Sequence, residues 1–463
     1  MAASTAFRSC GDRVARQMTI TRADGITDTV TYNKGARFLI VLLVVNLHIL
    51  RNYPPIGNAY LIAWTGITAM VCIDYYVART RGVVRTQHNY LAVWLLVGLT
   101  GFVASLATIS LTGSLYGLAR FWFALPVYIA LLAYTRDEQD LRKYIAWSVA
   151  FFAFAVATIP LQVALGPISW FREESLRGGF ARYSSLLGGL NAAGGAAGAY
   201  ILLAQSMRGA KRWFLTSVIV ACVLIDLSKS GVVTIVAALV ILLLLNVKRF
   251  LYLVLGCSTL LGVGFVLYRT LPVVQLRVET TLISFGMARG SGLRNSDLSV
   301  TESAWDRLTV LPMHNINSWV ELGSPLKYFV GGGFGMGSTA LVPAEDSLSP
   351  MAHNQYVEIL TVFGVLGAGL LLFSLFGALF RLVKTQPGSG VSRGLRQLCM
   401  LAMALLLGRF LFANGALYHP ASATPLFICM FVAGAKLRSP DVSRVVDLVR
   451  SPRGYDRRRL CAD

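Results

Sequence analysis

Charged residues are scarce in this sequence, and their scarcity is the first limit on what the chain can be. Only 14% of its 463 residues are charged, whereas 55% are hydrophobic, and the mean hydropathy is +0.62. Soluble domains carry about 25% charged residues. The composition therefore excludes a soluble domain and indicates a polytopic membrane protein.

The sequence also lacks the usual signatures of cofactor sites. No Cys/His set has the spacing of a zinc site, and no Gly-x-Ser-x-Gly elbow is present. The glycine run 331–337 lacks the Lys-Ser/Thr of a phosphate loop, so we predict a flexible turn there and expect no cofactor and no metal. The seven cysteines fall in apolar runs or on the side predicted to be cytoplasmic, and no disulfide is expected between the outer loops.

Apolar runs that approach the length of a membrane span recur along the chain, since a spanning helix needs about 20 apolar residues. We predict an all-α polytopic membrane protein with about 12 transmembrane helices, nine in residues 37–271 and three in 353–438. Only Lys229 and Ser230 separate the seventh and eighth spans, so the count could change by one or two. The predicted spans are 37–50, 57–78, 89–110, 115–135, 144–166, 184–207, 213–228, 231–247, 250–271, 353–383, 397–413 and 423–437.

Basic residues are concentrated on one side of this pattern. The chain has 42 basic and 22 acidic residues, and its net charge is +20. By the positive-inside rule, both termini are cytoplasmic, with segment 1–36 and the basic tail 439–463 on that side. A membrane surface therefore explains the charge better than nucleic acid does. Segment 272–352 becomes a large periplasmic loop, in which apolar stretches at 273–285 and 305–322 predict short helices on or near the membrane.

Arginines are frequent in the two polar segments predicted to lie outside the membrane. The shorter segment, 166–183, holds Arg172, Arg177 and Arg182, and the long loop holds Arg307. A guanidinium presents a planar fork of donors that suits phosphate and stays charged at any physiological pH. These arginines are candidates for binding a lipid-linked diphosphate. Snorkelling at the interface, or pairing with Glu173 and Glu174, is the alternative role.

Three polar side chains lie within or beside apolar runs, where an unpaired charge is costly and marks a site by default. They are Lys229, Arg409 and Asn191, and each is a candidate for lining an outer cavity. Asn191 belongs to a stretch of small residues, 188–195, that permits close backbone approach. An ion pair with Asp226 at i, i+3 spacing is the alternative role for Lys229.

His353 and Asn354 follow the long loop at the start of the predicted span 353–383. An imidazole there can hold or transfer a proton near neutral pH, which the surrounding apolar side chains cannot do. The alternative is a histidine that only anchors the helix end among lipid headgroups.

The segment HNQYVEILTVFGVLG, residues 353–367, resembles the signature His-Asn, nine residues, Gly-x-x-Gly of the bacterial O-antigen ligase and polymerase superfamily. Three other features resemble that family in the same order along the chain. They are Arg182 with the helix of Asn191, the LSKSG step at 227–231, and the glycine-rich stretch 330–337.

This resemblance covers about residues 170 to 380 and implies a metal-independent, membrane-embedded glycosyltransferase with a GT-C-like fold. The donor would be a glycan on undecaprenyl diphosphate in the bacterial inner membrane, and the site would be periplasmic. His353 would orient or deprotonate the acceptor hydroxyl, and Asn354 would position the imidazole. The arginines and Lys229 would neutralise the departing diphosphate, although the family usually has Arg where Lys229 stands.

O-antigen ligation to the lipid A core is the activity we expect, with polymerisation of O-antigen or exopolysaccharide repeat units as the alternative. A lipid-linked glycan flippase or a secondary transporter is a further alternative, because it would also have many spans and charges at membrane depth. Alternating access predicts polar groups on both sides of the midplane. Here the polar candidates gather on the predicted outer side.

Overall fold

The computed structural model describes most of the chain between Asn33 and Leu437. The described residues are 16–21, 27–52, 56–81, 90–168, 171, 174–177, 180–189, 191–226, 228–245, 306–337, 341–342, 346–348, 353–384, 389–413 and 415–437, with six single positions between 258 and 275. The predicted span 250–271 and the predicted helix 273–285 lie almost entirely outside them. The basic tail 439–463 and the first 15 residues also lie outside the described part of the chain.

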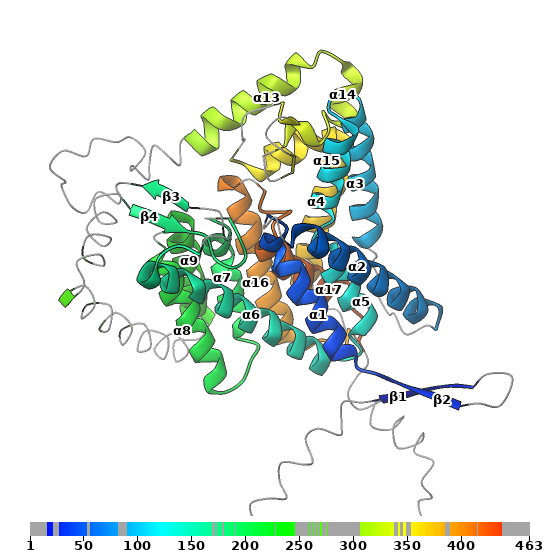
Figure 1. Cartoon of the computed structure of the whole chain (residues 1–463), viewed down its shortest axis with the longest axis vertical. Coiled ribbons are helices and arrows are strands. Elements are labelled where there is room, and N and C mark those ends of the chain that lie inside the picture. The colour runs from blue at the N-terminus through cyan, green and yellow to red at the C-terminus, as the bar shows by residue number, and fades with distance from the viewer. Residues whose placement is uncertain are drawn as a thin grey trace, which may run out of the picture.

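Helices dominate the described residues and follow the apolar runs of the sequence (Figure 1). Their bounds are α1 (Lys34–Asn46), α2 (Gly57–Thr80), α3 (Tyr90–Leu106), α4 (Leu111–Phe121), α5 (Leu125–Tyr134), α6 (Glu138–Leu165), α7 (Ala192–Ala204), α8 (Ala210–Ile225), α9 (Lys229–Leu245), α13 (Leu311–Glu321), α14 (Pro325–Val330), α15 (Gln355–Val383), α16 (Arg393–Arg409) and α17 (Pro420–Gly434).

Several of these helices could cross a membrane. Among the described residues, α2, α6, α15 and α16 are long and apolar enough, and the bent pair α4 and α5 makes a fifth if it is one span. The apolar helices α3, α7, α9 and α17 are shorter. The membrane class is thus supported, and each predicted span except 250–271 overlaps a described helix. The total of 12 spans and the periplasmic loop stay predictions.

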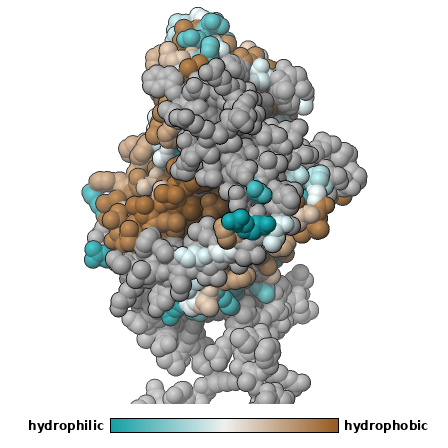
Figure 2. All heavy atoms as spheres, turned by 90° about the vertical axis from the view of Figure 1, so that its left-hand side faces the viewer, coloured by the Kyte–Doolittle hydropathy of each residue, from teal (hydrophilic) through white to brown (hydrophobic). Residues whose placement is uncertain are grey.

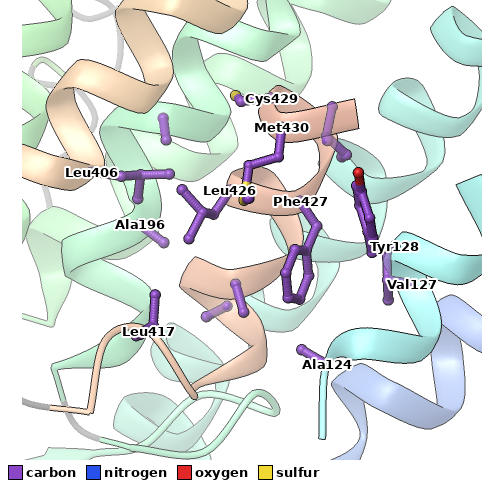
Figure 3. Packing of buried hydrophobic residues seen from close by; sticks show 14 of the residues in the cluster. Ala124, Val127, Tyr128, Ala196, Leu406, Leu417, Leu426, Phe427, Cys429 and Met430 are labelled. Atoms are coloured by element: carbon purple, nitrogen blue, oxygen red, sulfur yellow. The ribbon is translucent and has the colours of Figure 1, made fainter. Parts of the chain in front are cut away.

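Three helices form the centre of the bundle, because every one of their residues is buried. They are α5, α7 and α17. The rings of Phe427 of α17 and Tyr128 of α5 lie 5.6 Å apart, and Leu426 points toward Leu406 of α16 (Figure 3). This apolar centre holds together helices that lie far apart in the sequence.

The outer surface of the bundle is apolar as well. Phe373 of α15 is 80% exposed. It belongs to a stripe with three- and four-residue spacing along that helix, formed by Val365, Leu366, Leu370, Phe373, Phe376, Phe380 and Val383. Figure 2 shows a continuous hydrophobic area on the face that it displays. Surfaces of this kind are rare on soluble monomers and suit contact with lipid.

Helix α15 is broken at Gly364, whose φ of 65° and ψ of −175° are not helical. At the break, the carbonyl oxygens of Thr361 and Val362 accept hydrogen bonds from the N–H groups of Gly332, at 2.9 Å, and Gly333, at 3.1 Å. Within a membrane, backbone groups of an interrupted helix must find partners inside the protein. The glycine segment supplies those partners.

The glycine segment 331–337 is therefore packed, and the prediction of a flexible turn is wrong. All seven of its residues are buried. A Cβ on Gly331 would lie 2.1 Å from the carbonyl oxygen of Val362, and the N–H of Phe334 donates to Ser105 Oγ of α3 at 2.6 Å. Glycine is needed because the backbone itself touches α15.

The segment that precedes the glycine segment 331–337 is helical, as its apolar residues predict. A π-helical turn, η4 (Asp306–Val310), leads into α13. Two short antiparallel hairpins, β1 (Arg16–Thr21) with β2 (Thr27–Tyr32) and β3 (Glu174–Arg177) with β4 (Phe180–Tyr183), were not predicted. They leave the helical class unchanged.

Replacing Gly364 with alanine should destabilise the protein. The new Cβ would lie 2.3 Å from the N of Gly331, and a positive φ is unfavourable for L side chains. We expect a loss of about 2 to 4 kcal/mol, measured as a lower melting temperature in detergent. Gly369 of the same helix has no atom within 4 Å of its ideal Cβ, so Gly369→Ala is the matched control. Equal melting temperatures for the two variants would contradict the role of the break.

Candidate functional site

His353 occupies a strained position directly before α15. Its φ is 48°, and it is the only non-glycine residue with a positive φ in the described part of the chain. This conformation costs an L-residue about 1 kcal/mol and persists only where the surroundings impose it. Asn354 is the N-cap of α15, since its Oδ1 accepts from the N–H of Tyr356 at 3.0 Å and of Val357 at 3.3 Å. Asn354 thus fixes the backbone next to His353.

Arg307 on η4 is the charge that acts on His353. Burial and the Arg307 guanidinium lower the pKa of His353 to about 4. The imidazole is therefore neutral at pH 7 and able to accept a proton. Nη1 of Arg307 donates to the carbonyl oxygen of Phe412 at 3.5 Å. Phe412 ends η7 (Phe410–Phe412), the short turn that continues α16, so this contact links the long loop to the end of α16.

Arg409 is a buried cation at the same end of α16, with 9% of its surface exposed. Its Nη1 donates to Ser422 Oγ at 2.5 Å and its Nη2 to the carbonyl oxygen of Asn191 at 3.2 Å. A Cβ on Gly195 would lie 1.9 Å from Arg409 Cζ, so the guanidinium fits against bare backbone of α7. No carboxylate among the described residues pairs with it. A net positive charge results beside the start of α7.

The starts of α7 and α9 lie together at this end. A Cβ on Gly194 would lie 2.6 Å from Ser228 Oγ, and Thr234 Oγ1 donates to the carbonyl oxygen of Gly194 at 2.9 Å. Asn191 immediately precedes α7, and Lys229 is the first residue of α9. The small residues of α7 thus allow close approach, as their sequence predicts, and the structure brings positions 191 and 229 to one end of the helix pair.

The β3–β4 hairpin carries two of the predicted arginines. In its register, position 177 at the end of β3 and position 182 in β4 lie on the same face of the ribbon. Nε2 of Gln162 in α6 donates to the carbonyl oxygen of Ser184, just after β4, at 2.8 Å. The hairpin that holds Arg177 and Arg182 is therefore attached to the end of α6. Arg172 lies outside the described residues.

A buried polar cluster follows His353 within the first turns of α15, and no motif predicted a role for it. Glu358 is 1% exposed, and its Oε2 accepts from Gln355 Nε2 at 2.8 Å and from the N–H of Gly415 at 3.0 Å. Gln355 Nε2 also lies 3.2 Å from the hydroxyl oxygen of Tyr418. The cluster ties the loop before α17 to α15. A carboxylate inside an apolar helix was the available signal.

A second His-Asn pair, His314 and Asn315, lies in α13. Asn315 is buried, and its Oδ1 accepts from Thr361 Oγ1 at 2.8 Å while its Nδ2 donates to the carbonyl oxygen of Met336 at 3.3 Å. His314 is exposed. Asn315 therefore fixes α13 against α15, and with it the π-helical turn that carries Arg307.

These contacts assemble one end of the bundle as a candidate site. Figure 1 shows the β3–β4 hairpin and α13 on the same side of the helices. A neutral imidazole can accept a proton there, while Arg307 and Arg409 can hold an anion. No group of three or more His, Cys, Asp or Glu side chains that could hold a metal ion occurs among the described residues. Proton transfer beside a bound anion is the chemistry that these residues suit.

Replacing Arg307 with glutamine should raise the pKa of His353 from about 4 part of the way to its ordinary value of about 6.5, because the positive charge is removed while burial, the larger cause of the shift, remains. An NMR titration of the full chain in detergent measures this shift, with the signal identified by its loss in His353→Gln. Between these two values the unfolded state binds more protons, so the free energy of unfolding rises with pH in that window. Arg208→Gln, at an exposed position between α7 and α8, is the control. An unchanged titration in Arg307→Gln would contradict the coupling.

Comparison with known proteins assigns no function to these residues. No family model matches the chain, and no curated protein matches it.

Proposed function

We propose that this protein transfers a glycan from undecaprenyl diphosphate to an acceptor at the periplasmic face, with O-antigen ligation to the lipid A core as the specific reaction. The observation that carries the proposal is His353, held in a strained conformation at the start of a membrane helix beside Arg307. The motif that contains His353 resembles that of O-antigen ligases and polymerases. Strained residues cluster where function requires them.

In the proposed reaction, the acceptor hydroxyl oxygen bonds to the anomeric carbon while the bond from that carbon to the diphosphate oxygen breaks. His353 receives the hydroxyl proton, and the leaving undecaprenyl diphosphate carries the negative charge. Arg307 and Arg409 stabilise that charge, together with Arg182, Arg177 and Lys229 from the neighbouring segments. Pre-placed cations of this kind favour the transition state because charge develops next to them.

The low pKa of His353 fits this order of events. Before the donor binds, burial and the Arg307 charge together keep the imidazole neutral and a weak base. A diphosphate bound at Arg307 would offset that charge and raise the pKa of His353 toward its ordinary value. General-base strength grows as the pKa approaches the working pH. Donor binding would thus strengthen the base at the moment it is needed.

His353→Ala should reduce glycan transfer by about 10²- to 10⁴-fold, because the proton acceptor is lost. The assay is transfer from lipid-linked donor to acceptor by the purified full chain, at matched protein levels. His314→Ala removes the exposed histidine of the second His-Asn pair and should leave transfer unchanged. Retained activity in His353→Ala would remove this residue from the mechanism.

Deletion of the gene in its native host should separate the candidate activities. We expect long polymer retained on undecaprenyl diphosphate and lipid A core without O-antigen, seen on a lipopolysaccharide gel beside the lipid-linked pool. Single repeats attached to the core would instead indicate a polymerase. An unchanged profile would contradict both activities and favour another polysaccharide or transport.

A further inference from the structure

The end of the bundle opposite His353 contains two cavities around the start of α16. His353 precedes α15, whereas the cavities lie at its other end, about 40 Å away along a 29-residue helix. The first has a volume of about 240 Å³, and its lining includes Leu382, Val383, Val391, Arg393, Arg396 and Gln397. The second has a volume of about 360 Å³, and its lining includes Arg142, Gln205, Ser206, Gly394 and Gln397. They adjoin at Gln397, which lines both.

Arg396 gives the first cavity a buried donor. The residue is 4% exposed, and its Nη2 donates to the carbonyl oxygens of Arg381 at 2.5 Å and Lys384 at 3.0 Å. Its Nη1 has no hydrogen-bond partner among the described residues. A buried N–H of a charged group without a partner is expensive, which favours a ligand that accepts from it.

A second arginine lies beside this donor, and the Glu138 carboxylate at the start of α16 is already bonded to Arg142 and Ser392. Arg393 is exposed on the first turn of α16, at the rim of the same cavity. The first turn of a helix also presents free N–H groups and the positive end of the helix dipole. A phosphate oxygen is the acceptor that suits two guanidinium groups beside a helix N-terminus.

The second cavity contains a buried acceptor, whereas the first contains a buried donor. Gln205 is 5% exposed, and its Oε1 is a buried acceptor with no hydrogen-bond partner in the described part of the chain. Arg142, by contrast, is already bonded to Glu138 and to the carbonyl oxygen of Ser206. A ligand that reaches both cavities would therefore accept from Arg396 and donate to Gln205. A phosphate that carries a hydroxylated substituent has both groups.

The surroundings of the first cavity are those of a lipid. Leu382, Val383 and Met400 give it an apolar wall. Val383 is also the last residue of the exposed stripe of α15, in which it follows Phe380 one helical turn later. An acyl chain can lie along that stripe while the headgroup enters the cavity. A free phosphate ion would leave this apolar wall without a partner.

We propose that these adjoining cavities bind the headgroup of an anionic, hydroxylated phospholipid of the phosphoglycerol class. Its phosphate accepts from Arg396 and Arg393, and a glycerol hydroxyl donates to Gln205. Basic pockets between membrane helices are known sites for anionic headgroups. The site is separate from His353 and its role does not depend on glycan transfer.

The test is native mass spectrometry of the full-length protein in detergent, titrated with phosphatidylglycerol, phosphatidylcholine or inorganic phosphate. The wild-type protein should retain phosphatidylglycerol in preference to phosphatidylcholine. Arg393→Gln should weaken this binding about fivefold, since one basic residue near an anionic lipid contributes roughly that factor. Gln397→Glu places a negative charge at the junction of the cavities and should weaken it at least as much. Both positions are exposed, so folding is preserved.

Arg208→Gln removes an exposed arginine that lines neither cavity and should bind like the wild type. Equal weakening in Arg208→Gln would show a general charge effect and overturn the site. Unchanged binding in both Arg393→Gln and Gln397→Glu would overturn it as well. Inorganic phosphate that binds as tightly as the lipid would overturn the lipid assignment in favour of a free anion.

Discussion

The requirement that backbone groups find partners in an apolar environment fixes much of this structure. Helix α15 is interrupted at Gly364, and the carbonyl oxygens just before the break bond to the N–H groups of Gly332 and Gly333. Such partners have to come from the protein itself inside a membrane. The segment that supplies them is therefore held against α15. A side-chain hydrogen bond from Thr361 to Asn315 also holds α13 against α15. The position of the π-helical turn with Arg307 beside His353 follows from this attachment.

Buried polar side chains extend the same constraint to the other helices. At the start of α15, Glu358 accepts a hydrogen bond from the N–H of Gly415, and Gln355 accepts one from the N–H of Leu417. These bonds position the loop before α17. Arg409 joins α16 to the carbonyl oxygen of Asn191 before α7. Buried polar groups that find partners in an apolar interior favour one arrangement, because another would leave them without those partners. The candidate site is built from helix ends whose relative positions these bonds fix.

Sequence patterns predicted the parts of this molecule that depend on local composition. Apolar runs located the helices, and the small residues around Gly194 indicated a close backbone approach, for which the structure supplies the partner, α9. The role of the glycine segment 331–337 could not be predicted, because it depends on a helix break at Gly364, well beyond the segment in the sequence. For the same reason the sequence predicted no role for Glu358, because its hydrogen-bond partner Gly415 lies 57 residues away in the chain. Motifs identify residue types at a site, whereas the bonds that orient them are nonlocal.

The conformation of His353 separates two explanations for its presence. A histidine that merely anchors a helix end needs no particular backbone geometry, and the N-cap role belongs to Asn354. At a φ of 48° a glycine would avoid the strain that histidine carries. Burial together with the Arg307 charge then disfavours protonation of the ring, so the side chain does not add an ion pair either. Helix capping, backbone fit and charge pairing thus give no stability reason for an imidazole at this position. The proposed role, a neutral proton acceptor beside a cation, would account for an imidazole at this position.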